Sequence, residues 1–217
     1  MLNKQITKEQ IKDHLHNGMT ILVGGFMAVG TPSTIIDAIV ESKVKDLILV
    51  CNDAGYEDKG IGLIIKNGQC KKLITSHIGL NPQAQDMMKD GSMEIELTPQ
   101  GTLAEKIRAG GSGLGGVLTP TGLGTLVEQG KEVISVDGKL YLLEKPIKGD
   151  LAIIKANICD TKGNSTLLGT TINFNPVMSL AAENVIVESD EIVEHVNPNH
   201  VTIPHVVVNH IIQGGNI

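Results

Sequence analysis

Aromatic side chains are scarce in this 217-residue chain, which holds two Phe, two Tyr and no Trp. Hydrophobic residues nevertheless make up 41% of the sequence, so Ile, Leu, Val, Ala and Met must build the core. A chain of this length can bury one sizeable core or form two very small domains. Branched aliphatic residues are typical of strands that are buried on both faces of a parallel sheet. The shortage of aromatics therefore favours an α/β fold.

Cysteine is also sparse, with three residues at positions 51, 70 and 159. An odd number of widely spaced cysteines is typical of free thiols and not of a disulfide framework or a zinc site. We therefore expect a cytoplasmic protein that holds no metal.

Acidic residues outnumber basic ones: the chain has 24 Asp and Glu but only 18 Lys and Arg, which gives a formal net charge of −6. A nucleic-acid partner usually needs a basic face, so none is expected. No apolar run is long enough to span a membrane. The first 13 residues are mostly polar and lack the apolar stretch of a signal peptide.

Short β-branched runs alternate with segments of helical periodicity in the first half of the chain. The expected strands are 19–25, 46–52, 72–78 and 93–98, and the expected helices are 7–17, 32–42, 60–67, 82–89 and 103–109. Such alternation predicts an α/β fold with a mostly parallel, doubly wound sheet and helices on both faces.

The second half of the chain has a different pattern. Asp137-Gly138 predicts an added β-hairpin over 131–143. A glycine-rich loop is expected at 110–116, a buried strand at 150–157, a short helix at 176–182 and a last strand at 185–188. No linker or internal repeat is apparent, so we expect one domain over residues 1–217.

One loop has a composition suited to binding an anion. Residues 17–32 read NGMTILVGGFMAVGTP, so a strand ends at Gly24-Gly25 and a helix begins at Pro32, which Thr31 can cap. Adjacent glycines let the backbone approach a ligand, and the N–H groups of a helix start add partial positive charge. A carboxylate, a phosphate or a developing oxyanion would suit this loop, and a tight turn without a ligand is the alternative.

Two familiar nucleotide-binding loops do not fit this segment. Gly25 and Gly30 have the spacing of a P-loop, but Thr31-Pro32 stands where Lys and Ser or Thr are required. The glycine spacing also departs from G-x-G-x-x-G, which disfavours a nicotinamide enzyme.

Several motifs together resemble one family. Residues 17–32 match a signature in which Asp/Asn-Gly is followed, after two positions, by three apolar residues and Gly-Gly-Phe, and then by Gly and Pro. Other similar segments occur in the family's order at 76–79 (SHIG), 98–103 (TPQGTL), 108–113 (RAGGSG), 119–122 (TPTG) and 173–176 (NFNP). The chain thus resembles the A (alpha) subunit of the 3-oxoacid and acetate/butyrate–acetoacetate coenzyme A (CoA) transferases.

This resemblance implies an activity and a partner. Enzymes of the family move CoA from an acyl-CoA, such as acetoacetyl-CoA, acetyl-CoA or butyryl-CoA, to a short-chain carboxylate by a ping-pong mechanism. Their nucleophile is a Glu in a Ser-Glu-Asn-Gly motif of a B subunit, and this sequence lacks that motif. Its nearest string, Ala182-Glu183-Asn184-Val185, lacks both flanking residues and runs into a predicted strand. The resemblance therefore implies an A subunit that carries no catalytic nucleophile, in an assembly of two A and two B chains. It implies CoA as a substrate, and no cofactor or metal.

The candidate substrate-binding residues follow predicted strand ends, where open α/β sheets place ligands. They are Gly24, Gly25, Phe26, Gly30, Gln100, Asn52, Ser76 and Gly79. Gln100 can donate to an oxyanion through its amide, or it can bond to backbone at a helix start. Asn52 lines the same crevice or simply forms a turn. The loop at 110–116 borders the acyl pocket, packs on the partner, or is a plain connection.

Other polar residues have simpler interpretations. Glu188, Asp190, Glu191 and Glu194 form an acidic stretch that we expect to be solvated. His205 and His210 lack metal-ligand spacing, and Cys51 is expected in the core. A different class of function also stays open, namely an effector-binding module of related fold that recognises a sugar phosphate, although no helix-turn-helix motif accompanies it.

Overall fold

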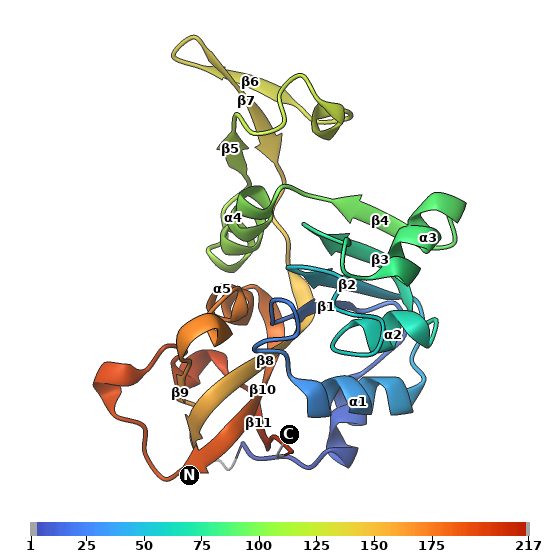
Figure 1. The fold of residues 1–217 in the computed structure, drawn as a ribbon. Coiled ribbons are helices and arrows are strands. Elements are labelled where there is room, and N and C mark those ends of the chain that lie inside the picture. Colours follow the sequence, from blue (N-terminus) through green and yellow to red (C-terminus); the bar gives the residue numbers. More distant parts are fainter. Residues whose placement is uncertain (1–3, 216–217) are drawn as a thin grey trace.

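The computed structural model describes residues 4–215. Its main sheet has eight strands, and seven of them follow the order β11-β10-β8-β1-β2-β3-β4, all paired in parallel; β9 adds to β8 antiparallel. Figure 1 shows this sheet as the twisted centre of the molecule. The predicted mostly parallel, doubly wound sheet is confirmed.

The secondary structure elements have the following bounds. The strands are β1 Thr20–Val23, β2 Leu47–Cys51, β3 Cys70–Thr75, β4 Glu94–Leu97, β5 Val117–Thr119, β6 Val133–Val136, β7 Lys139–Glu144, β8 Gly149–Asp160, β9 Ser165–Thr166, β10 Ala182–Val193 and β11 His210–Gln213. The α-helices are α1 Ser33–Ser42, α2 Gly62–Lys66, α3 Pro82–Asp90, α4 Gln100–Gly111 and α5 Asn175–Leu180. The 3-10 helices are η1 Glu9–His14, η2 Leu126–Glu128, η3 Gly169–Thr171, η4 Pro198–His200 and η5 His205–Val207.

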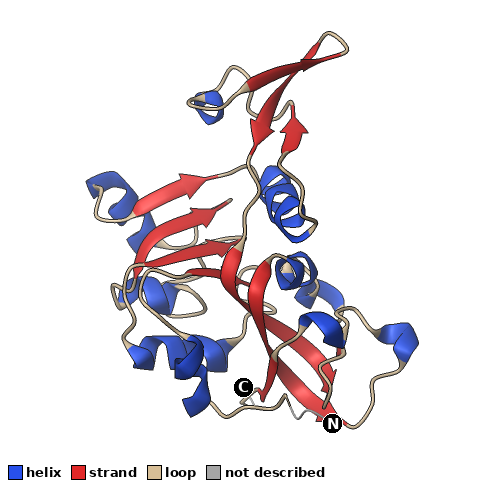
Figure 2. Ribbon diagram, turned by 180° about the vertical axis from the view of Figure 1, so that it is seen from behind, coloured by secondary structure: helices blue, strands red, loops and turns tan. Residues whose placement is uncertain are grey.

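Helices cover both faces of the main sheet, as expected. Successive strand residues point to opposite faces, so Ile21 and Val23 pack in one core with α1 and α2, while Leu22 packs in the other with α4 and α5. Figure 2 shows the two helical layers from behind. The two cores are almost entirely aliphatic, in agreement with the shortage of aromatics.

A second, smaller sheet stands apart from the main one. Its three strands follow the order β5-β7-β6 and are antiparallel. Asp137 and Gly138 join β6 to β7 with φ values of 50° and 75°, as a type I′ turn requires. Figure 1 shows this sheet projecting beyond α4. The predicted hairpin over 131–143 is confirmed, and β5 extends it.

Several predicted boundaries are wrong for identifiable reasons. The segment expected as a helix over 7–17 forms only the short 3-10 helix η1. Ile11 is the buried residue of η1, and a single buried side chain is too small an apolar face to support a longer helix. Gly110 and Gly111 belong to the last turn of α4 instead of a loop. Both positions need glycine because α4 packs closely there: an added Cβ would lie 1.8 Å from the Ile147 carbonyl oxygen at Gly110 and 2.8 Å from the Leu180 Cβ at Gly111.

The end of the chain also differs from expectation. The strand expected at 185–188 continues as β10 to Val193, because the equally long β8 pairs with it throughout. It is not the last strand either, since β11 pairs with it in parallel. The four residues of β11 carry too short an apolar run to be recognised alone.

Candidate functional site

The loop after β1 lies where the order of the main sheet reverses. The chain moves outward from β1 through β2, β3 and β4, and then returns to place β8 on the other side of β1. Open α/β sheets bind ligands at the carboxyl ends of strands at such a point. Gly24 and Gly25 follow the end of β1 directly, and the Gly24 N–H donates to the carbonyl of Ile153 in β8 at 3.0 Å.

The loop makes a very tight reversal. Phe26 and Val29 exchange two backbone hydrogen bonds of 2.9 Å, which leaves Met27 and Ala28 as the turn. Both turn residues have positive φ, at 48° and 65°, a backbone region that side chains disfavour. The side chains of Phe26, Met27 and Val29 are exposed. The tip of this loop therefore presents apolar side chains to its surroundings.

Glycine is required at the start of this loop. A Cβ on Gly24 would lie 1.6 Å from Oδ1 of Asn175, and a Cβ on Gly25 would lie 2.0 Å from Oγ1 of Thr31. Gly25 also has a φ of +124°. Gly30 is confined as well, because its Cβ would lie 2.9 Å from the Cα of Thr171. All three predicted glycines of this loop therefore lie where a side chain would collide with a neighbouring residue.

The N–H groups of the loop are used differently from our expectation of free donors that point into a cleft. The Gly25 N–H donates to Oδ1 of Asn173 at 3.2 Å, and the Met27 N–H donates to Oδ2 of Asp53 at 2.9 Å. The protein itself thus occupies the donors before the turn and at its first residue. These two N–H groups are therefore not free to donate to a ligand, and the binding role of the glycines stays a prediction.

Three other predicted residues meet at the neighbouring strand ends. Asn52 follows β2, Ser76 follows β3, and Gln100 begins α4. The Gln100 amide donates to Oδ1 of Asn52 at 2.8 Å, and the Ser76 hydroxyl donates to the Asn52 carbonyl at 2.6 Å. Asn52 is buried, while Gln100 is exposed. Gly79 lies further along its loop, exposed, with its N–H on Nδ1 of His77.

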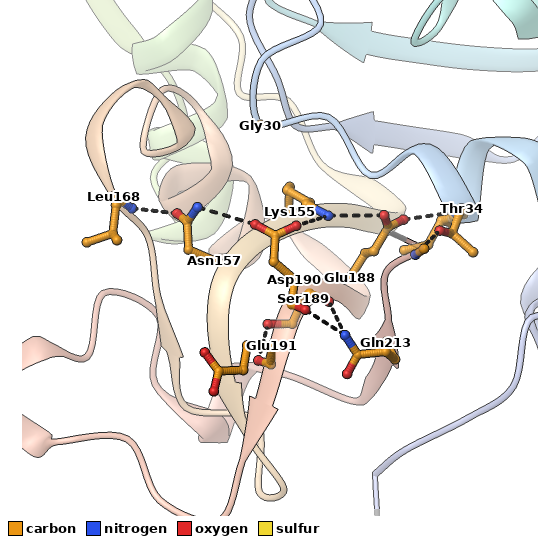
Figure 3. Close-up of polar contacts among 12 residues, drawn as sticks. Gly30, Thr34, Lys155, Asn157, Leu168, Glu188, Ser189, Asp190, Glu191 and Gln213 are labelled. Carbon is orange, nitrogen blue, oxygen red and sulfur yellow. Dashed lines mark hydrogen bonds and ion pairs between the residues drawn. The ribbon is translucent and has the colours of Figure 1, made fainter. Parts of the chain in front are cut away.

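A buried ion-pair cluster lies behind the loop at the start of α1. Glu188 of β10 is fully buried, and its Oε2 accepts a hydrogen bond from the Ile35 N–H of α1 at 3.1 Å. Its Oε1 lies 3.2 Å from Nζ of Lys155, which lies 2.6 Å from Oδ1 of Asp190. Figure 3 shows Lys155 between the two carboxylates. A carboxylate of the protein thus already faces the partial positive charge of this helix terminus.

This cluster corrects two predictions. Glu188 does not belong to a solvated acidic stretch, because it pairs with a lysine from the adjacent strand; Asp190, Glu191 and Glu194 are exposed. Thr31 does not cap α1, since the N-cap residue is Pro32, which makes no side-chain cap bond, and Glu188 accepts from the Ile35 N–H instead. Lys155 could have been found in the sequence as a charge within the apolar run LAIIKA.

Sequence reasoning also missed the two asparagines that contact the loop. Asn175 is fully buried, and its Nδ2 donates to the carbonyls of Gly30 at 3.1 Å and Thr171 at 2.8 Å. Asn173 accepts from Gly25, as described above. The available signal was the NFNP segment at 173–176, which we connected with a family but with no site.

A second loop repeats the pattern of the first. Residues 25–30 read GFMAVG and residues 55–60 read GYEDKG, 30 positions later. Tyr56 and Lys59 form the same kind of bridge as Phe26 and Val29. Oδ1 of Asp53 accepts from the Gly55 N–H at 2.8 Å, so this carboxylate bonds to both loops.

The remaining candidates lie away from these loops. Glu183 is exposed at the amino end of β10, opposite the strand ends that carry the site. His210 contacts the ring of His14, with centroids 4.3 Å apart; burial and then the charges of His14 and Lys4 lower the pKa of His210. Within residues 4–215 there is no cluster of His, Cys, Asp and Glu suited to a metal ion. No helix in that range is long and apolar enough to cross a membrane.

Comparison with known proteins gives a consistent result. A family model described as coenzyme A transferase matches residues 4–214. The acetate CoA-transferase subunit alpha of Escherichia coli K12 is 50% identical over 214 residues, which covers 98% of this chain and 97% of that protein. The acetoacetyl-CoA:acetate/butyrate CoA transferase alpha subunit of Clostridium acetobutylicum is 48% identical over 215 residues, with 98% and 99% coverage.

Solved structures show that the fold is shared more widely. An acyl-CoA transferase of Escherichia coli O157:H7, in a thioester complex with CoA, superposes with a TM-score of 0.86 at 22% identity, over 96% of this chain and 46% of that one. Glutaconate CoA-transferase of Acidaminococcus fermentans gives a TM-score of 0.83 at 20% identity, over 97% of this chain and 75% of that one.

Proposed function

The chain belongs to the coenzyme A transferase family, and from this premise we propose that it is the A (alpha) subunit of an enzyme that moves CoA from an acyl-CoA to a short-chain carboxylate. The proposed donors are acetoacetyl-CoA, acetyl-CoA and butyryl-CoA. The observation that carries the proposal is the sequence similarity to two alpha subunits, which are 50% and 48% identical over 98% of this chain. Their names specify acetate, acetoacetyl-CoA and butyrate.

The proposed reaction is a ping-pong exchange. A glutamate carboxylate attacks the thioester carbonyl, which expels CoA thiolate and leaves an acyl–glutamyl anhydride. The thiolate attacks the glutamyl carbonyl, which releases the donor acid and leaves a glutamyl-CoA thioester. The acceptor carboxylate then attacks that thioester and expels the thiolate again, and thiolate attack on the new acyl carbonyl yields the product acyl-CoA and free glutamate.

This chain would supply binding groups to that sequence and no nucleophile. Each addition places negative charge on a carbonyl oxygen, which a nearby amide donor stabilises. Gln100 is our candidate donor. One of its two amide hydrogens is directed to Asn52, and this bond holds the amide plane so that the other hydrogen faces a fixed direction. The Gly24–Gly30 segment would form the wall beside the acyl group, with Phe26 at its tip.

A partner subunit is a necessary part of the proposal. We propose that a B chain with the Ser-Glu-Asn-Gly motif supplies the nucleophile, in an assembly of two A and two B chains. The position of Glu183 at the opposite edge of the sheet supports this division, because no attack on a substrate beside Gly24 could start from there. We further propose that CoA enters as a substrate, that no metal or redox cofactor takes part, and that the enzyme works in the cytoplasm, where free thiols persist.

The test is co-expression with the candidate B chain, followed by an exchange assay with a panel of acyl-CoAs and acids. We expect exchange, and a glutamyl-CoA thioester that hydroxylamine or borohydride traps, only when both chains are present. Gln100→Glu should lower kcat on the order of 10²-fold or more, as for other oxyanion donors. Robust exchange by this chain alone would refute the division of roles. Calorimetric binding of a sugar phosphate by the isolated chain would instead favour the effector-binding module, which no structural observation favours.

A further inference from the structure

Three side chains bond to the backbone of the Gly25–Gly30 loop at three separate points. Asn173 accepts from the Gly25 N–H, Asp53 accepts from the Met27 N–H, and Asn175 donates to the Gly30 carbonyl. These points are the beginning, the tip and the end of the loop. The three side chains come from two distant parts of the chain, so the loop is held from two sides.

Asn175 makes the most extensive of these contacts. Its Nδ2 bonds to the carbonyls of Gly30 and Thr171, and its Oδ1 accepts from the Lys155 N–H at 3.3 Å. The same Oδ1 fills the space in which a Cβ of Gly24 would lie. The side chain is fully buried, so water cannot replace these bonds. Asn175 therefore connects the loop to β8 and to the segment before α5.

Asn173 and Asp53 complete the set. Asn173 is itself fixed, because its Nδ2 donates to the Thr170 carbonyl at 2.9 Å. Asp53 is buried and bonds to Gly55 as well as Met27, so it ties the first loop to its repeat.

The loop needs such support because its conformation is unfavourable. Met27 and Ala28 both have positive φ, a backbone region that is strained for residues other than glycine. Such a conformation persists only where the surroundings impose it. A loop freed from these bonds would sample other conformations, and Phe26 would lose its fixed place beside the acyl site.

We propose that Asn173, Asn175 and Asp53 are positioning residues that hold the Gly25–Gly30 loop in its reactive conformation. This inference rests on the transferase function proposed above. The three residues act through the loop and need not touch the substrate. Loss of one of them should lower kcat with a smaller change in KM, because the loop would be misplaced during the chemical steps.

The experiment compares Asn175→Ala with Gln69→Ala in the assembled A and B enzyme. Gln69 is a matched control, because it is a buried amide whose Nε2 donates to two carbonyls, those of Ile39 and Val44, at 2.9 Å each. It lies beside the amino ends of the strands, away from the loop. We expect both variants to lose similar thermal stability, while kcat falls at least about tenfold for Asn175→Ala alone, since a 1 Å misplacement can cost about 10²-fold. If Asn175→Ala fails to fold, Asn173→Ala replaces it.

Hydrogen–deuterium exchange supplies a readout that does not need activity. The peptide that covers residues 24–31 should exchange faster in Asn175→Ala than in Gln69→Ala or wild type. A kcat within twofold of the control, or a loss of kcat with unchanged exchange of this peptide, would overturn the proposal. If the wild-type assembly shows no CoA transfer, the proposed function fails instead, and the exchange comparison alone decides whether these residues hold the loop.

Discussion

Replacing Gly24 with Ala tests the packing of the loop most directly. Gly24 has a φ outside the left-handed region, so alanine would suit its backbone. The cost must come from Asn175, whose Oδ1 would lie 1.6 Å from the new Cβ, where 3.0 Å is the closest ordinary approach. Asn175 must therefore retreat by at least the difference of 1.4 Å, and it cannot do so while it keeps its bonds of 3.1 Å to Gly30 and 2.8 Å to Thr171.

The magnitude follows from these contacts. Overpacking costs about 1–3 kcal/mol and each of the two lost hydrogen bonds about 0.5–1.5 kcal/mol, so Gly24→Ala should destabilise the chain by about 2–6 kcal/mol. A chain of this size loses about 2–4 °C in Tm for each kcal/mol, which predicts a drop of about 4–24 °C. In an Asn175→Ala background the obstacle is absent, so the same change should cost less than about 1 kcal/mol.

The assay is a double-mutant cycle from urea unfolding or scanning calorimetry of the single and double variants. Gly101→Ala is the control, because Gly101 lies in the first turn of α4 with nothing within 4 Å of the added Cβ. That variant should be neutral or more stable by about 0.5–1 kcal/mol. If Gly24→Ala costs the same with and without Asn175, the packing argument for this loop is wrong.

Three further predictions concern the buried polar groups. Glu188→Ala leaves Lys155 without its buried partner and the Ile35 N–H without an acceptor, and it should cost about 3–5 kcal/mol by urea unfolding; a loss under about 1 kcal/mol would contradict the role of this pair. Burial raises the pKa of Asp160, but the hydrogen bonds from Asn164, Val196 and Lys162 outweigh it and leave this pKa below its ordinary value of 3.8. Because the pKa of Asp160 is lower in the folded than in the unfolded state, its ionised form stabilises the fold at neutral pH, and that contribution disappears as the pH falls through the folded-state pKa. The free energy of unfolding of Asp160→Asn should therefore fall less steeply with pH below about pH 4 than that of the wild type. An unchanged slope would contradict this. Burial raises the pKa of Cys70 to about 12 and of Cys159 to about 11, and that of Cys51 well above its usual value, so iodoacetamide at neutral pH should alkylate these thiols quickly only in denaturant, as mass spectrometry would show.

Local patterns were enough to predict the architecture. The alternation of apolar runs and helical stripes depends on neighbouring residues, so β1 to β4 and α1 to α4 were found near their observed positions. The turn at Asp137-Gly138 was equally local. The parallel pairing of the strands could be predicted because strands that alternate with helices usually pair in parallel. The position of β8 beside β1 could not be predicted, because nothing in the local sequence specifies which distant strand pairs with β1.

The interior of the site could be predicted only in part. The glycines of the loop could be recognised from the local sequence. The side chains that contact them lie about 150 positions away in the chain, as Asn173 does from Gly25. Glu188 looked solvated because its sequence neighbours are acidic, whereas its burial depends on Lys155 in another strand and on the start of α1. Contacts of this kind are set by the tertiary fold, so single-sequence reasoning could not find them.

The position of β1 in the sheet affects how the protein is made. β1 pairs on one side with β2, which follows it closely, but on the other side with β8, where Leu22 faces Ala152 across 130 residues of chain. Ribosomes add about 5–20 residues per second, so β8 emerges roughly 6–26 seconds after β1. For that interval the growing chain carries an open strand edge next to the future site, available to any other nascent strand. The central place of β1, beside the proposed binding crevice, thus also leaves the nascent chain open to mispairing during synthesis.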